Sequence, residues 1–161
     1  MKVKDLMRTK PATVLPDTPL KTVWDLLSHQ RYYILPVVDN EGLIKGIITA
    51  HDLLLHLMPD YREFFSDFFP NVPTFEEVER KLSAEMHLTA ADVMTSVVFS
   101  VRQKHDVFKA LTRMLAYNRR VLPVTDEQDK LVGYIVEKDI FKYLFQKEKR
   151  LLKRLEQRKS K

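Results

Sequence analysis

Apolar and polar positions follow the same order twice along the chain. A shift of 87 residues aligns residues 5–57 with residues 92–144 without a gap, and the same Leu-Pro-Val run begins at Leu35 and at Leu122. Most apolar positions between such identical residues also match in kind. Because so many matches share one offset, the chain contains an internal duplication, and this duplication decides the architecture.

Each copy contains the elements of a β-α-β-β-α unit. In the first copy, Thr18 is predicted to be the N-cap of a helix and Pro19 its first residue, where the missing N–H costs nothing. The helix presents one apolar face at helical spacing, made by Leu20, Val23, Leu26 and Leu27. A strand pair and a second helix follow. Strands are predicted over 12–14, 34–38 and 43–49 and over 99–101, 121–125 and 131–136, with second helices beginning near Ala50 and Glu137.

This order of elements predicts an α/β (α+β) fold built from two repeats. One copy is too small to bury much surface alone, so the two copies are expected to pack together. The expected organisation is repeat 1 over 1–57, a helical insertion over 58–89, repeat 2 over 90–145 and a basic C-terminal helix or tail over 146–161.

The insertion is predicted to be a helical hairpin. Its first helix carries an aromatic stripe that Pro70 ends, and its second helix opens with a capping box formed by Thr74 and Glu77. The hairpin either covers its own core or offers a surface to a partner or a second copy. The stripe consists of Tyr61, Phe64, Phe65, Phe68 and Phe69.

Positive charge is concentrated in the tail. The whole chain carries a formal net charge of +5, but residues 146–161 contain eight Lys or Arg and two Glu, so the remainder is close to neutral. The tail is read as a solvated helix end, as a dimerisation helix, or as a contact for nucleic acid or an anionic membrane. Nucleic acid is the less favoured partner, because the interleaved aromatics of a strand-binding groove are missing from the tail.

Composition excludes several classes of site. The chain has no cysteine and only three glycines, which removes thiolate chemistry, cysteine metal sites and a glycine-rich phosphate loop. His51 and His56 are five residues apart, the wrong spacing for one helix face, so no metal site is expected. No nucleophile elbow occurs, so no enzymatic activity is expected. The start of the sequence lacks a signal-peptide pattern and no apolar run is long enough to span a bilayer, which predicts a cytoplasmic protein.

Three short motifs occur in order, once in each copy. The first copy reads Asp5-Leu6-Met7, then Leu35-Pro36-Val37-Val38-Asp39, then Gly46-Ile47-Ile48-Thr49-Ala50-His51-Asp52. The second copy reads Asp92-Val93-Met94-Thr95, then Leu122-Pro123-Val124-Thr125-Asp126, then Gly133-Tyr134-Ile135-Val136-Glu137-Lys138-Asp139. This pattern resembles the CBS-domain family, and the arrangement resembles the tandem pair called a Bateman module.

The resemblance implies two repeats packed with pseudo-two-fold symmetry, leaving two clefts that bind an adenine nucleotide. In the family, the Asp of the last motif binds the ribose hydroxyls and the neighbouring Ser or Thr holds ribose or phosphate. The ligand would be AMP, ADP, ATP or S-adenosylmethionine, with no further cofactor required. By this resemblance the first cleft uses Thr49, Asp52, Thr95, Val98, Phe99, Arg120 and Val121, and the second uses Asp139, Pro11, Ala12, Tyr33 and Ile34.

Three residues depart from the family pattern. Val136 replaces the hydroxyl residue in the second copy, Arg8 stands where Thr is usual, and Phe99 is large for a residue lining a base slot. These differences favour the Thr49 and Asp52 cleft over the Asp139 cleft. Thr49 and Asp52 also have the spacing of a helix capping box, which needs no ligand.

The sequence therefore predicts a non-enzymatic, energy-sensing regulatory module, expected to be a homodimer that transmits nucleotide occupancy to an unidentified protein. Such transmission requires different ligand affinity in two conformations. Two alternatives stay open. One is a ligand-independent association module that uses the hairpin and tail, and the other is a nucleic-acid-associated protein that uses the tail.

Overall fold

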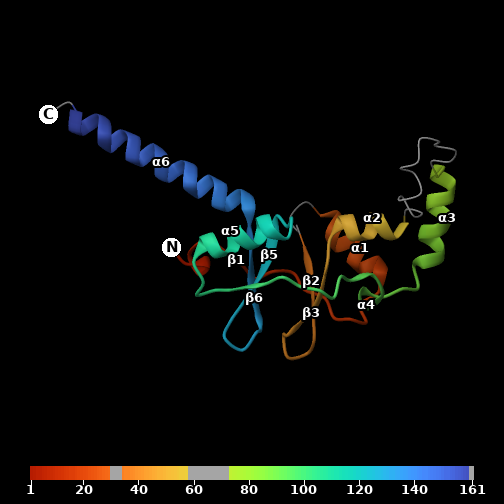
Figure 1. Ribbon diagram of the computed structural model, residues 1–161. Helices are drawn as coiled ribbons and strands as arrows, with labels where there is room; N and C mark the ends of the chain where they lie inside the picture. The colour runs from red at the N-terminus through yellow and green to blue at the C-terminus, as the bar shows by residue number, and fades with distance from the viewer. Residues whose placement is uncertain (30–33, 58–72, 160–161) are drawn as a thin grey trace. The chain divides into compact units, whose positions relative to one another are not determined.

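A computed structural model describes residues 1–29, 34–57 and 73–159, with side chains up to residue 148 (Figure 1). The chain divides into two compact units. Unit 1 combines Met1–Lys10 with Phe99–Lys161, and unit 2 contains Pro11–Val98. The predicted aromatic stripe of the insertion lies outside the described residues.

Unit 2 is built around a two-stranded antiparallel sheet. Strands β2 (Leu35–Val38) and β3 (Ile44–Ile48) pair with Leu35 opposite Ile48. Single bridges extend both edges, because Val14 pairs parallel with Val37 and Thr95 pairs antiparallel with Ile47. The helices of this unit are α1 (Leu20–Ser28), α2 (Ala50–Leu57), α3 (Phe75–Glu85) and α4 (Ala90–Val93).

Unit 1 contains a four-stranded sheet in the order β1-β6-β5-β4. Strand β4 is parallel to β5, and the other neighbouring pairs are antiparallel. The strands are β1 (Arg8–Thr9), β4 (Val101–Arg102), β5 (Val121–Thr125) and β6 (Leu131–Val136). A 3-10 helix η1 (Val3–Asp5) precedes them, and the α-helices are α5 (Val107–Ala116) and α6 (Glu137–Lys159).

The same strand order occurs in both units once the offset of 87 residues is applied. Arg8 lies beside β6 as Thr95 lies beside β3, and Val101 pairs with β5 as Val14 pairs with β2. Each sheet therefore takes one edge from the segment that begins the other repeat. Residues 1–10 belong to the unit of repeat 2, and residues 90–98 belong to the unit of repeat 1.

Gly133 allows this edge segment to approach β6. A Cβ at Gly133 would clash with the backbone carbonyl oxygen of Arg8, so no side chain fits there without moving the backbone. At the equivalent position, a Cβ at Gly46 would instead clash with the side chain of Met94. At both positions the neighbouring edge segment packs too closely to leave room for a side chain.

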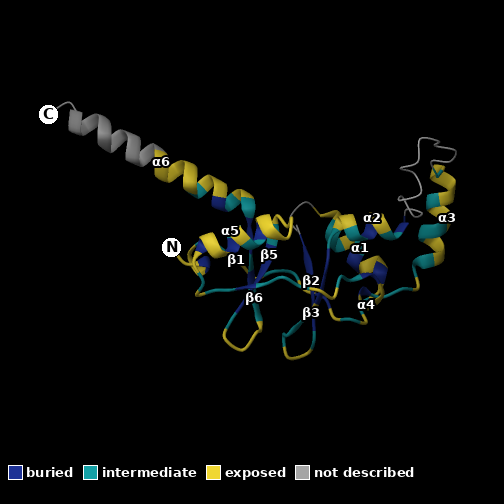
Figure 2. Ribbon diagram, in the orientation of Figure 1, coloured by how far each residue is buried: buried dark blue, intermediate teal, exposed yellow. Residues whose placement is uncertain are grey.

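Each unit buries its own apolar cluster, and the buried positions gather on the long strands and on one face of the helices (Figure 2). Burial of these side chains removes them from water, at about 25 cal/mol for each Å² of apolar surface. The cluster of unit 1 contains Val3, Val101, Val107, Ala110, Met114, Leu122, Val124, Ile135 and Ile140. That of unit 2 contains Val14, Leu20, Val23, Leu35, Val37, Ile48, Leu53, Ala90 and Val93.

The predicted start of the first helix is wrong by one residue. Helix α1 begins at Leu20 with Pro19 as N-cap, and the hydroxyl of Thr18 instead accepts the N–H of Leu15 at 3.0 Å. The N–H of Leu20 donates to the carbonyl of Leu88 at 2.9 Å, so a tertiary contact satisfies a donor that a capping side chain would otherwise take.

Other boundaries follow the sequence closely. The predicted strands over 121–125 and 131–136 and the helix starts at Ala50 and Glu137 are confirmed. The Thr74 and Glu77 capping box is present. The strand predicted over 12–14 is reduced to the single bridge at Val14, and the strand predicted over 99–101 occurs at Val101–Arg102.

Candidate functional site

Thr49 and Asp52 stand where β3 ends and α2 begins. The backbone N–H of Thr49 donates to Oδ2 of Asp52 at 2.8 Å, and the Thr49 hydroxyl donates to the same oxygen at 2.5 Å. The N–H of Asp52 donates in return to Oγ1 of Thr49 at 3.2 Å. This reciprocal arrangement is the capping box expected from the spacing, and it fixes the carboxylate at the N-terminus of α2.

Thr95 brings a second hydroxyl to the same carboxylate. Its backbone pairs with Ile47 through two hydrogen bonds of 2.9 and 3.1 Å, which hold the segment after α4 against β3. From there the Thr95 hydroxyl donates to Oδ1 of Asp52 at 3.3 Å. Thr49, Asp52 and Thr95 are all half-buried, and we call them the Thr49–Asp52 site.

The chemistry of this site suits a polar, hydroxyl-rich ligand. A carboxylate has about four lone-pair positions, and a vicinal diol presents two donors to it. Free N–H groups and the positive end of the helix dipole at α2 favour an anionic group nearby. Oδ1 of Asp52 is the available acceptor, because its bond from Thr95 is long and the hydroxyl can rotate away.

Asp139 occupies the equivalent position in unit 1, but its partner is different. Arg8 donates to it through two bonds, Nε to Oδ2 at 2.8 Å and Nη2 to Oδ1 at 3.1 Å. The hydrogen bond with Asp139 raises the pKa of the Arg8 guanidinium above its usual value. Val136 stands at the position equivalent to Thr49 and supplies no hydroxyl.

Phe99 packs against an aromatic residue that sequence reasoning missed. The rings of Phe99 and Tyr117 stack with centroids 3.8 Å apart and an angle of 10° between their planes. Tyr117 is the C-cap of α5, and no motif marked it. One face of the predicted base-slot residue is therefore covered from within unit 1.

The remaining predicted residues divide between the units. In unit 1, Arg120 is exposed, its carbonyl accepts the N–H of Glu137 at 2.9 Å, and Val121 begins β5. In unit 2, Ile34 is buried, and Tyr33 lies outside the described residues. Pro11, Ala12 and Val98 are half-buried in unit 2.

Within the described part of the chain, no group of three or more His, Asp or Glu side chains is placed to hold a metal ion. Among the same residues, no helix is both long and apolar enough to cross a membrane.

The family model for the CBS domain matches the chain twice, over residues 3–59 and 90–146. The chain is 31% identical over 142 residues to a CBS domain-containing protein of Dictyostelium discoideum, covering 88% of this chain and 90% of that protein. It is 27% identical over 138 residues to the chloroplastic CBS domain-containing protein CBSX2 of Arabidopsis thaliana. That match covers 83% of this chain but only 58% of CBSX2.

Solved structures show the same fold. A crystal structure of the CBS-pair protein CBSX2 matches with a TM-score of 0.73 at 24% identity, covering 92% of this chain and 96% of that one. CBSX2 in complex with AMP matches with a TM-score of 0.69 at 23% identity, covering 91% and 98%. The CBS domain pair of protein MJ0100, in complex with 5′-methylthioadenosine and S-adenosyl-L-methionine, matches with a TM-score of 0.66 at 23% identity, covering 91% and 98%.

The repeated motifs, the strand order shared by the two units and the two family-model matches agree with one another. Together the matches cover more than half of the chain. This chain belongs to the CBS domain family and carries two CBS domains in tandem.

Proposed function

We propose that this chain binds an adenine nucleotide at the Thr49–Asp52 site and regulates a partner protein without catalysing a reaction. The observation that carries the proposal is the half-buried Asp52 carboxylate, whose Oδ1 is held by a long bond of 3.3 Å from the Thr95 hydroxyl. Relatives of the same fold support the ligand class, since CBSX2 binds AMP and the MJ0100 pair binds 5′-methylthioadenosine and S-adenosyl-L-methionine.

In this proposal, each residue of the site has a separate role. Asp52 accepts hydrogen bonds from the two ribose hydroxyls, which replace the long bond from Thr95. The Thr49 hydroxyl and the free N–H groups at the start of α2 lie on the phosphate side. The capping box keeps the carboxylate in one orientation before the ligand arrives, which lowers the ordering cost of binding.

The other members of the predicted site stay predictions. They are Val98, Phe99, Arg120 and Val121 for the first cleft, and Pro11, Ala12, Tyr33, Ile34 and Asp139 for the second. AMP, ADP, ATP and S-adenosylmethionine are the candidate ligands. The cytoplasmic location also stays a prediction, which cell fractionation tests.

A thermal-shift experiment tests ligand binding and has a matched control within the same unit. Thr89 and Asp92 form a second capping box, in which the Thr89 N–H donates to Oδ2 of Asp92 at 2.7 Å and the Thr89 hydroxyl at 2.8 Å. Asp52→Ala and Asp92→Ala therefore remove equivalent caps, at a cost of about 1 kcal/mol each. Only Asp52→Ala removes the proposed ribose acceptor.

The panel contains AMP, ADP, ATP, S-adenosylmethionine and GTP. Ligand at 100 times its dissociation constant stabilises the folded state by about 2.7 kcal/mol, which is a measurable rise in melting temperature. We expect an adenine-selective rise in the wild type and in Asp92→Ala, and none in Asp52→Ala. An equal rise in both variants, or no rise with any nucleotide at millimolar concentration, would contradict the proposal.

Ligand-independent association is a second candidate, and exposed aromatic side chains favour it. Phe141 on α6 is 68% exposed, and Phe108 on α5 is 59% exposed. Phe108, Tyr143 and Leu144 line one pocket of unit 1, so these three side chains lie close to each other. We propose a homodimer through this surface. Sedimentation tests it: the wild type is expected to be a dimer and Phe108→Ser a monomer, and a monomeric wild type contradicts the proposal.

Nucleic-acid association through the basic tail is tested separately. Deletion of residues 147–161 removes all eight Lys and Arg residues of the tail. Binding by phosphate contacts falls steeply with salt, so affinity that depends on salt and is lost on this deletion would support that function.

A further inference from the structure

Asp52 and Asp139 occupy the same position in the two repeats, but their carboxylates contact chemically different side chains. Asp52 faces the hydroxyls of Thr49 and Thr95, whereas Asp139 faces the guanidinium of Arg8. Arg8 and Thr95 are themselves equivalent under the offset of 87 residues. Each lies on the segment that forms one edge of its sheet, beside the glycine that the two repeats share. The difference is therefore one of residue type at a shared place in the fold.

The Arg8 fork engages both oxygens of Asp139. The distances of 2.8 and 3.1 Å describe a bidentate pair, in which both donors belong to one rigid, charged plane. At the Thr49–Asp52 site, the donor to Oδ1 is one neutral hydroxyl at 3.3 Å. A diol can displace a rotating hydroxyl easily, but to displace a bidentate guanidinium it must leave a charged group without its partner.

The backbone holds Arg8 in place. Arg8 lies opposite Tyr134 in the β1 and β6 register, and Gly133 permits the close backbone approach. The side chain of Asp139 is only 18% exposed, whereas that of Arg8 is 40% exposed. Hydrogen bonding to Asp139, and to a smaller extent to Tyr134, raises the pKa of the guanidinium, which is charged in any case.

We propose that Arg8 closes the Asp139 position to ribose, so that the chain takes one nucleotide rather than two. This inference rests on the proposed function of the Thr49–Asp52 site and makes Arg8 the residue that determines which repeat binds ligand. The Asp139 carboxylate then serves as the anchor of an ion pair that fastens β1 beside β6. Val136 contributes to the closure because it supplies no hydroxyl where Thr49 supplies one.

Isothermal titration with AMP measures the number of sites directly. The wild type is expected to bind one equivalent. Asp139→Ala is also expected to bind one equivalent, because in this proposal Asp139 holds Arg8 and is not a ribose ligand. The double variant Arg8→Thr with Val136→Thr rebuilds the residues of the Thr49–Asp52 site around Asp139, and it is expected to bind two equivalents. Adding Asp139→Ala to that double variant should return the number to one.

Other outcomes separate this inference from the proposed function. A wild type that binds two equivalents, a loss of one equivalent in Asp139→Ala, or a double variant that gains no equivalent would overturn the closure by Arg8. A wild type that binds none while the double variant binds one would refute the Thr49–Asp52 site and leave the role of Arg8 standing. If neither protein binds AMP, both proposals fail.

Folding of the variants needs its own check, because Arg8 also fastens an edge strand. Far-ultraviolet circular dichroism and a melting curve show whether the double variant is folded. If it is not, Arg8→Gln with Val136→Thr serves instead, since glutamine keeps much of the length of the side chain while it removes the charge and the fork. If the Arg8→Gln and Val136→Thr double variant is folded but still binds only one equivalent, the inference is also overturned.

Discussion

The hydroxyl of Thr95 donates to Oδ1 of Asp52 at 3.3 Å, across 43 residues of sequence. This contact joins the segment after α4 to the start of α2 and places two hydroxyls around one carboxylate. Its length leaves the carboxylate with an acceptor that a ligand can take. The site is thus assembled by the pairing of Thr95 with β3, which no local pattern determines.

Thr49→Val should weaken both folding and nucleotide binding. The change removes the hydroxyl that donates to Asp52 and accepts its N–H, so we expect a loss of about 1 kcal/mol in the free energy of unfolding. Urea denaturation measures this loss. Thr89→Val is the matched control, because it removes the equivalent hydroxyl at α4 and should leave nucleotide affinity unchanged. Equal affinity losses in both variants would contradict the role given to Thr49.

Gly133→Ala should destabilise the protein more than Gly46→Ala. A Cβ at Gly133 meets the backbone oxygen of Arg8, which cannot move without separating β1 from β6, whereas a Cβ at Gly46 meets the flexible side chain of Met94. Overpacking against backbone costs about 1–3 kcal/mol. Denaturation midpoints of the two variants test this order, and the reverse order would contradict the packing described.

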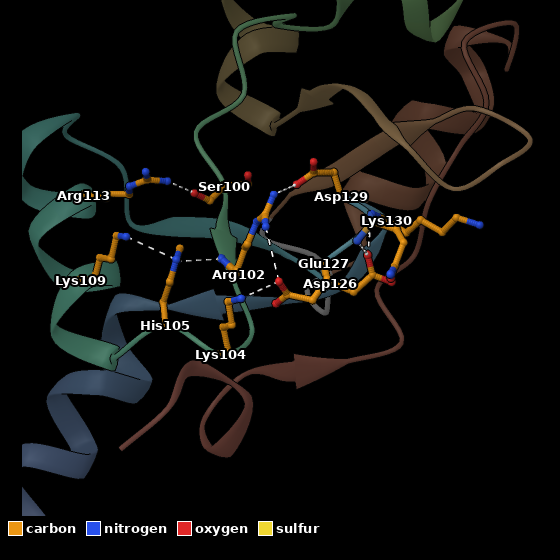
Figure 3. A network of polar contacts seen from close by, with 11 residues as sticks. Ser100, Arg102, Lys104, His105, Lys109, Arg113, Asp126, Glu127, Asp129 and Lys130 are labelled. Carbon is orange, nitrogen blue, oxygen red and sulfur yellow. Dashed lines mark hydrogen bonds and ion pairs between the residues drawn. The ribbon is translucent and has the colours of Figure 1, made fainter.

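Stability is expected to fall when the pH drops below about 6.5, through His105. Burial lowers the pKa of His105, and the positive charges of Lys109, Arg113, Arg102 and Lys104 lower it further. Nδ1 of His105 accepts the backbone N–H of Arg102 at 3.1 Å, a bond that protonation would break (Figure 3).

The sign follows from linkage. A lowered pKa in the folded state means that the unfolded chain takes up the proton first as pH falls. The stability is therefore complete above about 6.5 and is lost as the pH falls through the lowered folded pKa. His105→Asn keeps a hydrogen-bond acceptor but cannot titrate. The urea denaturation midpoint of this variant should therefore depend less on pH between 7.5 and 5 than that of the wild type. The same slope in both proteins would refute this assignment.

A second loss of stability is expected at lower pH, through Glu127. Its pKa is lowered by hydrogen bonding to Lys104, whose Nζ lies 2.6 Å from Oε2, and by the charge of Arg102 (Figure 3). A lowered carboxyl pKa gives stability that is fully present above the unfolded value of 4.5 and is lost as the pH falls through the lowered folded pKa. Glu127→Gln should reduce the acid dependence below pH 4.5, and an unchanged acid midpoint would contradict it.

The stack of Phe99 on Tyr117 should contribute to the stability of unit 1. Aromatic pairs in such geometry contribute about 0.5–1.5 kcal/mol beyond the area they bury. Tyr117→Leu keeps an apolar side chain but removes the stack, so we expect a loss in that range by urea denaturation. Leu115→Ala, at an exposed position of the same helix, is the control and should cost less. Equal losses would indicate that the stack contributes nothing of its own.

Much of the fold was predictable because its signals are local or repeated. Strand β5 follows from an apolar run ending at a turn, and the start of α2 follows from the Thr49 and Asp52 spacing. The start of α1 was not predictable in this way. The carbonyl of Leu88 accepts the N–H of Leu20, and the Thr18 hydroxyl is left to accept the N–H of Leu15 in a turn. Local propensity cannot anticipate a partner that is distant in sequence.

Only part of the candidate site was predictable from the sequence. Thr49, Asp52 and Thr95 were identified through the family resemblance, and the structure brings them together. The pair of Arg8 with Asp139 spans 131 residues and depends on which sheet takes the first strand. The offset of the repeat aligns Arg8 with Thr95 in the sequence. That alignment indicates a contact between Arg8 and Asp139 only once the order of strands in the sheet is known.

An amide NMR titration with AMP tests the central claim most directly, because it reports every backbone N–H at once. We expect the shifts to concentrate at Thr49–Leu53 and Thr95, to saturate with one dissociation constant, and to disappear in Asp52→Ala. Shifts confined to the basic tail, or an unchanged spectrum at millimolar AMP, would contradict nucleotide binding at the Thr49–Asp52 site.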